Sequence, residues 1–224
     1  MTAYIDLACW PRKEQFEFYR SLDRPQYSVC VQLDVTHFHA RVKKRGISFS
    51  HTFGFFVTHA ANEVPELRMR IKGGQVVLYD ELHPSFTEPR AGGALHKYVS
   101  VPLCGVLDVF LQRTSEAIAR QGERFFLPDE EARDDCLYLS AIPWLCFTGL
   151  THAENLDRDD AIPRISWGRW FGLGIACCCR FPCRRTTRLS TACISGSLLT
   201  RCKKSWMLFN RRFALQGGRF GWRV

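Results

Sequence analysis

Two histidines and one serine in this 224-residue sequence have the type and setting to take part in chemistry. His37 and His39 flank a phenylalanine at the end of a predicted strand, and such a pair can offer two metal ligands. Two imidazoles alone do not complete a zinc site, so we interpret both as surface histidines and expect no metal. Ser140 stands where a strand leads into Ala141. A hydroxyl there can hydrogen-bond a developing oxyanion, or the serine can be an ordinary strand residue.

Cysteine is the other reactive residue type in the chain. Cys30 and Cys146 have no identifiable base beside them, so we interpret them as small buried residues rather than nucleophiles. Six further cysteines crowd into residues 177–202 without the paired Cys-x2-Cys spacing of a zinc site. The sequence contains no phosphate loop, dinucleotide fingerprint, Gly-x-Ser-x-Gly motif or His-Glu-x-x-His motif.

The charge of the chain is divided as unevenly as its cysteines. The formal net charge is +9, yet residues 1–172 hold all 22 acidic residues beside 20 Lys and Arg. Residues 173–224 hold 11 basic residues and no acidic one. We therefore divide the chain into a body, residues 1–172, and a basic, Cys-rich tail, residues 173–224. The tail contains apolar runs that are atypical of a nucleic-acid-binding arm, so we expect no nucleic-acid partner.

The composition of the body is that of an ordinary globular domain. Hydrophobic residues make up 46% of the chain and charged residues 24%, and no apolar run reaches the ~18 residues of a membrane span. The N-terminus has neither the basic nor the apolar region of a signal peptide. We therefore expect a cytoplasmic protein without a membrane partner, in which a disulfide framework would be out of place.

Periodicity predicts an α/β two-layer sandwich for the body. Apolar positions at helical spacing predict helices, and strict alternation of apolar and polar residues predicts a half-buried strand. Strands and helices mixed in this way are typical of a sheet covered by helices. The predicted helices are 11–22, 53–64 and 107–121, and the predicted strands are 27–36, 75–79 and 136–142.

Five blocks of the body together resemble the type A chloramphenicol acetyltransferases. They occur in the family's order over residues 4–171, about three quarters of the chain. The blocks are 10–19 (WPRKEQFEFY), 61–71 (ANEVPELRMRI), 83–87 (HPSFT), 140–148 (SAIPWLCFT) and 162–168 (IPRISWG). The resemblance implies a two-layer α/β acyltransferase fold and a homotrimer with active sites between subunits. It also implies acetyl transfer from acetyl-CoA to the 3-hydroxyl of chloramphenicol, which confers antibiotic resistance.

The resemblance assigns roles to five residues by position. Ser140 matches the serine that hydrogen-bonds the tetrahedral oxyanion. Phe18 and Tyr19 match residues that line the antibiotic pocket, and Thr87 falls in a stretch that approaches the substrate. Arg12 matches the arginine that pairs with the aspartate of the family's His-His-x-x-x-Asp-Gly motif, whose second histidine is the general base.

That motif is absent from the chain, which has no histidine after His152. The codons that could encode Arg185 to Ile194 can also be translated in a shifted frame, in which the last base of each codon is joined to the first two bases of the next codon. This shifted frame permits His-His-Ala-Leu-Val-Asp-Gly-Leu-His, the family motif. We therefore interpret the tail as a frameshift product that begins near residues 171–173. One cause then explains the missing acidic residues, the excess of arginine and the run of cysteines.

The expected consequence is an inactive chain. The general base is lost, the strand before the motif disappears, and Arg12 keeps a charge without its aspartate, which is costly if the side chain is buried. Two other functions stay open. One is a ligand-binding relative that keeps the pocket without turnover, and the other is a CoA-dependent acyltransferase with a different acceptor.

Overall fold

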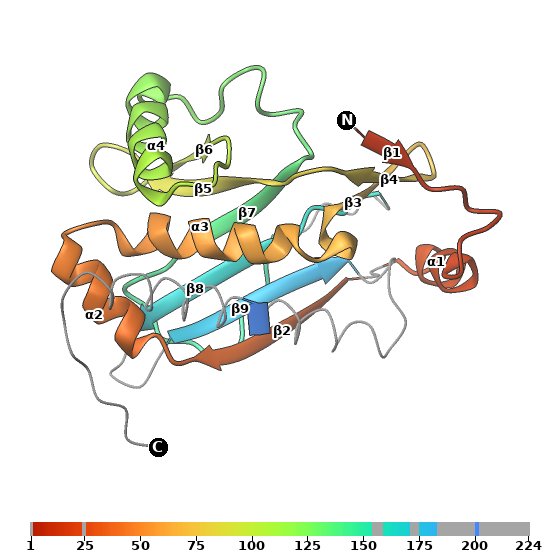
Figure 1. Cartoon of the computed structure of the whole chain (residues 1–224), viewed down its shortest axis with the longest axis horizontal. Coiled ribbons are helices and arrows are strands. Elements are labelled where there is room, and N and C mark those ends of the chain that lie inside the picture. The colour runs from red at the N-terminus through yellow and green to blue at the C-terminus, as the bar shows by residue number, and fades with distance from the viewer. Residues whose placement is uncertain (1, 24–25, 154–158, 171–174, 183–199, 202–224) are drawn as a thin grey trace.

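The computed structural model describes residues 2–23, 26–153, 159–170, 175–182 and 200–201 (Figure 1). Two sheets lie within these ranges. The larger has the strand order β2-β9-β8-β7-β5-β6, and the smaller has the order β1-β4-β3. In chain order the elements are β1 (Thr2–Tyr4), α1 (Lys13–Arg20), β2 (Gln26–Leu33), α2 (Thr36–Arg45), α3 (Phe49–Asn62), η1 (Pro65–Arg68), β3 (Met69–Lys72), β4 (Gln75–Tyr79), β5 (His83–Pro89), β6 (His96–Ser100), α4 (Leu107–Gln121), β7 (Cys136–Ala141), β8 (Arg164–Trp170) and β9 (Ile175–Pro182).

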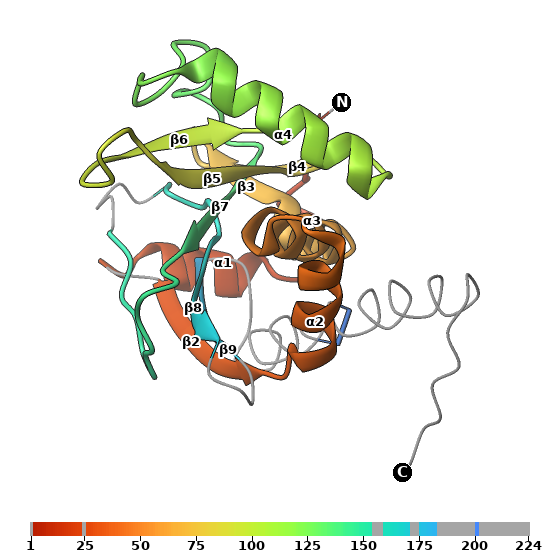
Figure 2. The ribbon, with the colours of Figure 1, turned by 90° about the vertical axis from the view of Figure 1, so that its left-hand side faces the viewer.

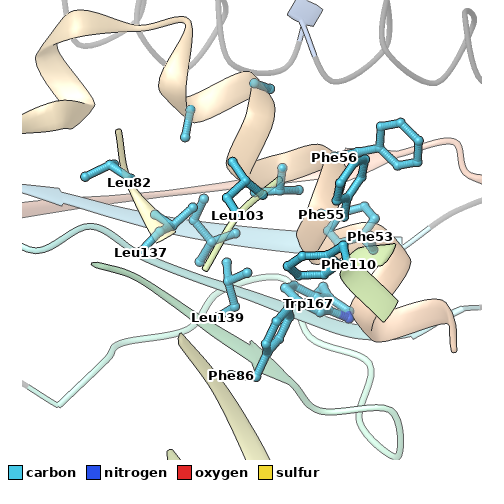
Figure 3. Close-up of a cluster of buried hydrophobic side chains, with 14 of the residues drawn as sticks. Phe53, Phe55, Phe56, Leu82, Phe86, Leu103, Phe110, Leu137, Leu139 and Trp167 are labelled. Atoms are coloured by element: carbon cyan, nitrogen blue, oxygen red, sulfur yellow. The ribbon is translucent and has the colours of Figure 1, made fainter. Parts of the chain in front are cut away.

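Helices α2, α3 and α4 cover one face of the larger sheet (Figures 1 and 2). Side chains from α3 meet side chains from β5, β7 and β8 in the main hydrophobic core (Figure 3). Phe53 and Phe110 are fully buried there, and Trp167 is 2% exposed. This arrangement confirms the predicted two-layer fold. No helix in the described ranges is both long and apolar enough to cross a membrane.

The central helix α3 depends on two local features of its sequence. The Ser48 hydroxyl accepts a hydrogen bond from the His51 backbone N–H at 3.3 Å, which satisfies one donor of the first turn. Gly54 then faces the sheet, where a Cβ atom would lie 2.4 Å from a ring carbon of Phe86 and 3.0 Å from Leu139. The absence of a side chain at Gly54 therefore lets α3 lie close to β5 and β7.

The start of β7, the strand that carries Ser140, is held by a buried arginine. Arg70 is 1% exposed, and its guanidinium donates to the carbonyl oxygens of Cys136 at 2.6 Å and Leu67 at 2.9 Å, and also to that of Asp134. Burial lowers the pKa of Arg70 to about 10, although the negative charge of the Asp134 carboxylate favours a higher pKa. Arg70 thereby joins β3 of the smaller sheet to β7 of the larger one.

Several sequence-based elements match the structure, and one strand ends earlier than predicted. The bounds predicted for β4 and α4 are those observed, and α1, α3 and β7 lie within a few residues of prediction. The predicted strand 27–36 ends early as β2, because Phe38 and Val42 begin the buried face of α2. His37 and His39 therefore lie on a helix, where residues two apart do not face the same side.

The strand expected to be missing beside β8 is present. Residues 175–182 form β9, which pairs antiparallel with both β2 and β8, and Ile175 is fully buried in the core. Strand pairing uses backbone N–H and C=O groups, which every residue except proline supplies. A run that contains isoleucine, cysteine and phenylalanine can therefore fill this position, and the expectation that the strand before the motif disappears is corrected.

Replacing Gly54 with alanine is expected to destabilise the protein. The added Cβ forces Phe86 or α3 to move, at a cost of about 1–3 kcal/mol that exceeds the gain in helix propensity. Denaturant unfolding of Gly54→Ala measures this loss. The matched control is Gly105→Ala, because a Cβ at Gly105 meets no atom within 4 Å. Equal stability of the two variants would contradict the close approach of α3.

Candidate active site

Ser140 lies on the face of the larger sheet opposite helix α3. Its strand alternates strictly, since Leu137 and Leu139 point into the core while Tyr138 and Ser140 are half-buried on the other side. We call this second side the open face. Ser140 is the register partner of Ser166 in β8, and both strands run in the same direction. The side chain expected to bind the oxyanion therefore belongs to the sheet itself, where backbone pairing fixes its position.

Thr87 lies beside Ser140 on the open face. Phe86 pairs with Leu139, so the next residues along these parallel strands, Thr87 and Ser140, are neighbours. The Thr87 hydroxyl donates to the Leu139 carbonyl oxygen at 3.4 Å, which agrees with this register. The structure thus brings together two residues that are 53 positions apart and that the sequence assigned to one site.

Phe18 and Tyr19 do not join Ser140 within one chain. Their helix, α1, packs through Phe16 against the smaller sheet and lies beyond the end of the larger sheet at which β2 begins (Figure 1). Strand pairing from β7 through β8 and β9 to β2 places Ser140 at the level of Cys30. Cys30 lies about 13 Å along β2 from Gln26, the first residue of that strand. Phe18 is 61% exposed and contacts Tyr19 with ring centroids 5.3 Å apart. These two rings therefore present an apolar surface near the end of the sheet at which β2 begins, away from Ser140.

Arg12 has an acidic partner. Its Nη2 atom lies 2.7 Å from Oε1 of Glu66, and the side chains are 31% and 18% exposed. The expectation that Arg12 carries an uncompensated charge is therefore wrong. Glu66 belongs to η1, 54 residues away in sequence, and sequence reasoning missed it because nothing local marks the two side chains as neighbours. The region that would encode the family motif, 185–194, lies outside the described residues.

Comparison with known proteins shows the family of this chain. A family model for chloramphenicol acetyltransferase matches residues 2–173. The chain belongs to this family. A chloramphenicol acetyltransferase from Proteus mirabilis is 31% identical over 175 residues, covering 76% of this chain and 78% of the relative. One from Escherichia coli is 29% identical over 171 residues, with the same coverage.

Solved structures place the fold in the same family. A chloramphenicol acetyltransferase structure aligns with a TM-score of 0.80 and 26% identity, covering 91% of this chain and 99% of that one. A probable dihydrolipoamide acetyltransferase from Listeria monocytogenes aligns with a TM-score of 0.60 and 12% identity, covering 87% and 92% of the two chains. The first match supports the family, whereas the second shows a shared acyltransferase fold only.

The remaining candidate residues of the acetyltransferase body have other roles. His39 stacks on Trp170 with ring centroids 4.5 Å apart, and His59 hydrogen-bonds the Cys104 carbonyl oxygen at 3.1 Å. Within the described ranges, no group of three or more His, Cys, Asp and Glu side chains could hold a metal ion. Cys30 is half-buried and Cys146 is exposed, so the expectation that Cys146 is buried is wrong.

The Arg12–Glu66 ion pair is expected to stabilise the fold measurably. We expect a coupling free energy of about 1 kcal/mol from a double-mutant cycle of Arg12→Met and Glu66→Gln, because both side chains are partly shielded from water. The matched control is the exposed pair Lys13–Glu17 on α1, for which we expect about 0.3–0.5 kcal/mol. A coupling no larger than that of the control would show that partial burial adds nothing to the Arg12–Glu66 interaction.

Thiol reactivity is expected to separate Cys136 from the exposed cysteines. Burial, reinforced by the Asp135 carboxylate, raises the pKa of Cys136 to about 12, so its thiol stays protonated near neutral pH. At about pH 8, iodoacetamide should modify Cys9 and Cys146 in the folded chain and leave Cys136 unmodified. Peptide mass spectrometry gives the pattern, and modification after unfolding is the control. Modification of native Cys136 as fast as Cys146 would contradict its burial.

Proposed function

We propose that the body of this chain is the scaffold for acetyl transfer from acetyl-CoA to the 3-hydroxyl of chloramphenicol, a cytoplasmic reaction that confers resistance. In this reaction the second histidine of the family's motif removes the proton of the chloramphenicol hydroxyl, and the hydroxyl oxygen then attacks the thioester carbonyl carbon of acetyl-CoA. The carbonyl oxygen becomes an oxyanion that the Ser140 hydroxyl hydrogen-bonds. The carbon–sulfur bond then breaks, and the CoA sulfur receives the proton.

The position of Ser140 is the observation that carries this proposal. Its hydroxyl is half-buried on a rigid strand, next to Thr87, in a chain of the acetyltransferase family. A donor held by strand pairing needs little reorganisation when charge develops, which is what oxyanion stabilisation requires.

We propose further that the functional unit is a homotrimer with sites between subunits. Phe18 and Tyr19 belong to α1, which lies beyond the end of the larger sheet at which β2 begins (Figure 1), and Ser140 lies further along the sheet. A neighbouring copy would therefore have to bring a complementary surface to either group. Exposed apolar side chains flank the site: Trp144 and Leu145, just after β7, are 73% and 47% exposed. Apolar surface of this kind is typical of protein interfaces.

The chain as written lacks the general base of this reaction, and we attribute the lack to a frame change near residues 171–173. On this proposal, residues 1–172 are the in-frame domain and 173–224 are out of frame. Strand β9 then consists of out-of-frame residues that still pair through their backbones. A strand position in a sheet tolerates such replacement, whereas a histidine motif does not.

A second function is compatible with the loss of the motif: binding of the antibiotic without turnover. The chain keeps the hydroxyls of Ser140 and Thr87 on the open face, and it keeps the apolar rings of Phe18 and Tyr19 on α1. Thermal stabilisation by chloramphenicol without formation of an acetylated product would favour this function.

Restoring the reading frame tests the proposal. We expect the frame-restored protein to acetylate chloramphenicol at least about 10²-fold faster than the chain as written, because general acid–base catalysis contributes roughly 10²–10⁴-fold. The rate is measured by trapping the thiol of released CoA. Ser140→Ala in the restored protein should lower kcat by roughly 10²–10³-fold.

Two controls make the outcome decisive. The restored protein with its second motif histidine changed to alanine should fall to the rate of the chain as written. Equal rates for the restored and unrestored proteins would refute the need for the motif. A restored protein that leaves chloramphenicol unmodified but acetylates another alcohol would refute the acceptor.

A further inference from the structure

A cysteine of the body lies directly opposite a cysteine of the tail in the larger sheet. Strands β2 and β9 are antiparallel, and their register pairs Cys30 with Cys178. No other two cysteines are register partners among the strand pairs that the structure describes. The fold thus brings together two thiol-bearing residues that are far apart in the sequence.

Register and alternation place both cysteines on the open face. On β2, Val31 packs against the main core, so its neighbour Cys30 belongs to the other face of the sheet. Cys178 is also the register partner of Ser166 on β8, which in turn pairs with Ser140 on β7. Register partners on adjacent strands share one face of a sheet. The two cysteines therefore continue, across β9 and β2, the line of residues that begins at Ser140.

The backbone spacing of such a pair is that of a disulfide. Directly opposed residues of antiparallel strands have Cα atoms about 4.5 or 5.5 Å apart, according to whether the pair exchanges backbone hydrogen bonds. Disulfides usually join residues whose Cα atoms are about 4.4–6.8 Å apart. Both kinds of strand position therefore meet the requirement without a movement of the backbone.

The cysteines on either side of Cys178 occupy different positions in the sheet. Cys177 and Cys179 are the β8-register partners of Trp167 and Ile165, which are 2% and 1% exposed in the core. Alternation along β9 therefore assigns these two cysteines to the core face and only the middle one to the open face. Of the three consecutive cysteines, one alone lies opposite the cysteine of β2.

We propose that Cys30 and Cys178 form an oxidation site, at which hydrogen peroxide converts two thiols into a disulfide that links β2 to β9. One of the two thiolates attacks a peroxide oxygen and the O–O bond breaks, which gives a sulfenic acid and hydroxide. The other thiolate attacks the sulfenic sulfur, so the S–O bond breaks as the S–S bond forms. The thiol protons leave with the oxygens, and two thiols and one peroxide give one disulfide and two waters.

Two features of the structure favour this reaction over random oxidation. Cys30 is half-buried, so a molecule as small as hydrogen peroxide can reach it. Strands β2 and β9 pair along the whole length of both, from Gln26 opposite Pro182 to Leu33 opposite Ile175, which holds the two backbones in register. In a reducing compartment such a disulfide is transient and forms in response to oxidant. The inference uses only strand register, and it does not depend on acetyl transfer.

Peptide mapping of the purified full chain tests the proposal. The folded chain is treated with excess hydrogen peroxide, the remaining thiols are blocked with N-ethylmaleimide, and the unreduced tryptic digest is analysed by mass spectrometry. We expect a cross-link between the peptide that contains Cys30 and the peptide 170–180, which contains the three consecutive cysteines. Dithiothreitol should remove it. Absence of this cross-link from a chain whose exposed Cys9 or Cys146 is oxidised would overturn the proposal.

Variants identify which of the three consecutive cysteines reacts. The combined variant Cys177→Ala, Cys179→Ala keeps Cys178 and should form the cross-link in the yield of the parent chain. Cys178→Ala keeps both neighbours, and its yield should fall by about 10-fold or more, because residues on the core face are not opposed to Cys30 on the same side. A cross-link formed by Cys178→Ala in the parent's yield would contradict the register argument.

Unfolding provides the second control, and it needs no variant. In the parent chain unfolded with guanidinium chloride before the addition of peroxide, Cys30 should pair with Cys178 no more often than with the other cysteines, because strand pairing is lost. A yield that unfolding does not lower would overturn the proposal, since the fold would then play no part in the choice of partner. Each of these outcomes leaves the proposed acetyl transfer to its own test.

Discussion

The packing of α3 against β5, β7 and β8 is the constraint on which the rest of the structure depends. Gly54 lets the helix axis approach the sheet, and Phe86 and Leu139 fill the space that a side chain there would occupy. Successive side chains of a strand point to opposite faces of the sheet. Because one face of β5 and β7 is buried in the core, Thr87 and Ser140 lie on the opposite face. The chemistry of the open face is therefore a direct consequence of how the hydrophobic face is buried.

The two faces differ in how specifically they depend on sequence. The core face of the sheet requires apolar side chains of suitable volume. Strand pairing requires only backbone donors and acceptors, so β9 pairs with β2 and β8 despite its run of cysteines. The open face needs named side chains at fixed register positions, because a one-residue shift would move Ser140 into the core. A chain of this kind can retain its fold while losing a catalytic group, which is the state we propose for it.

The contacts of two arginines show the same separation between local and distant determinants. Arg12 pairs with Glu66. Arg70 donates to four backbone carbonyls, of which those of Asp134 and Cys136 are far from it in sequence. Charged donors that are partly or fully removed from water are stable only with such partners. No sequence motif marks these contacts, because each forms only when separate elements meet.

The sequence by itself determined the fold class, the family, and the limits of β4 and α4. These depend on periodicity within one element or on contiguous blocks of residues, both of which are local. Only the tertiary structure decided that residues 36–45 form a helix, that Glu66 pairs with Arg12, and that the imidazole of His152 contacts the Ser166 hydroxyl on β8. Each of these is set by burial or by strand register across distant segments, and a linear pattern carries no record of which segments become neighbours.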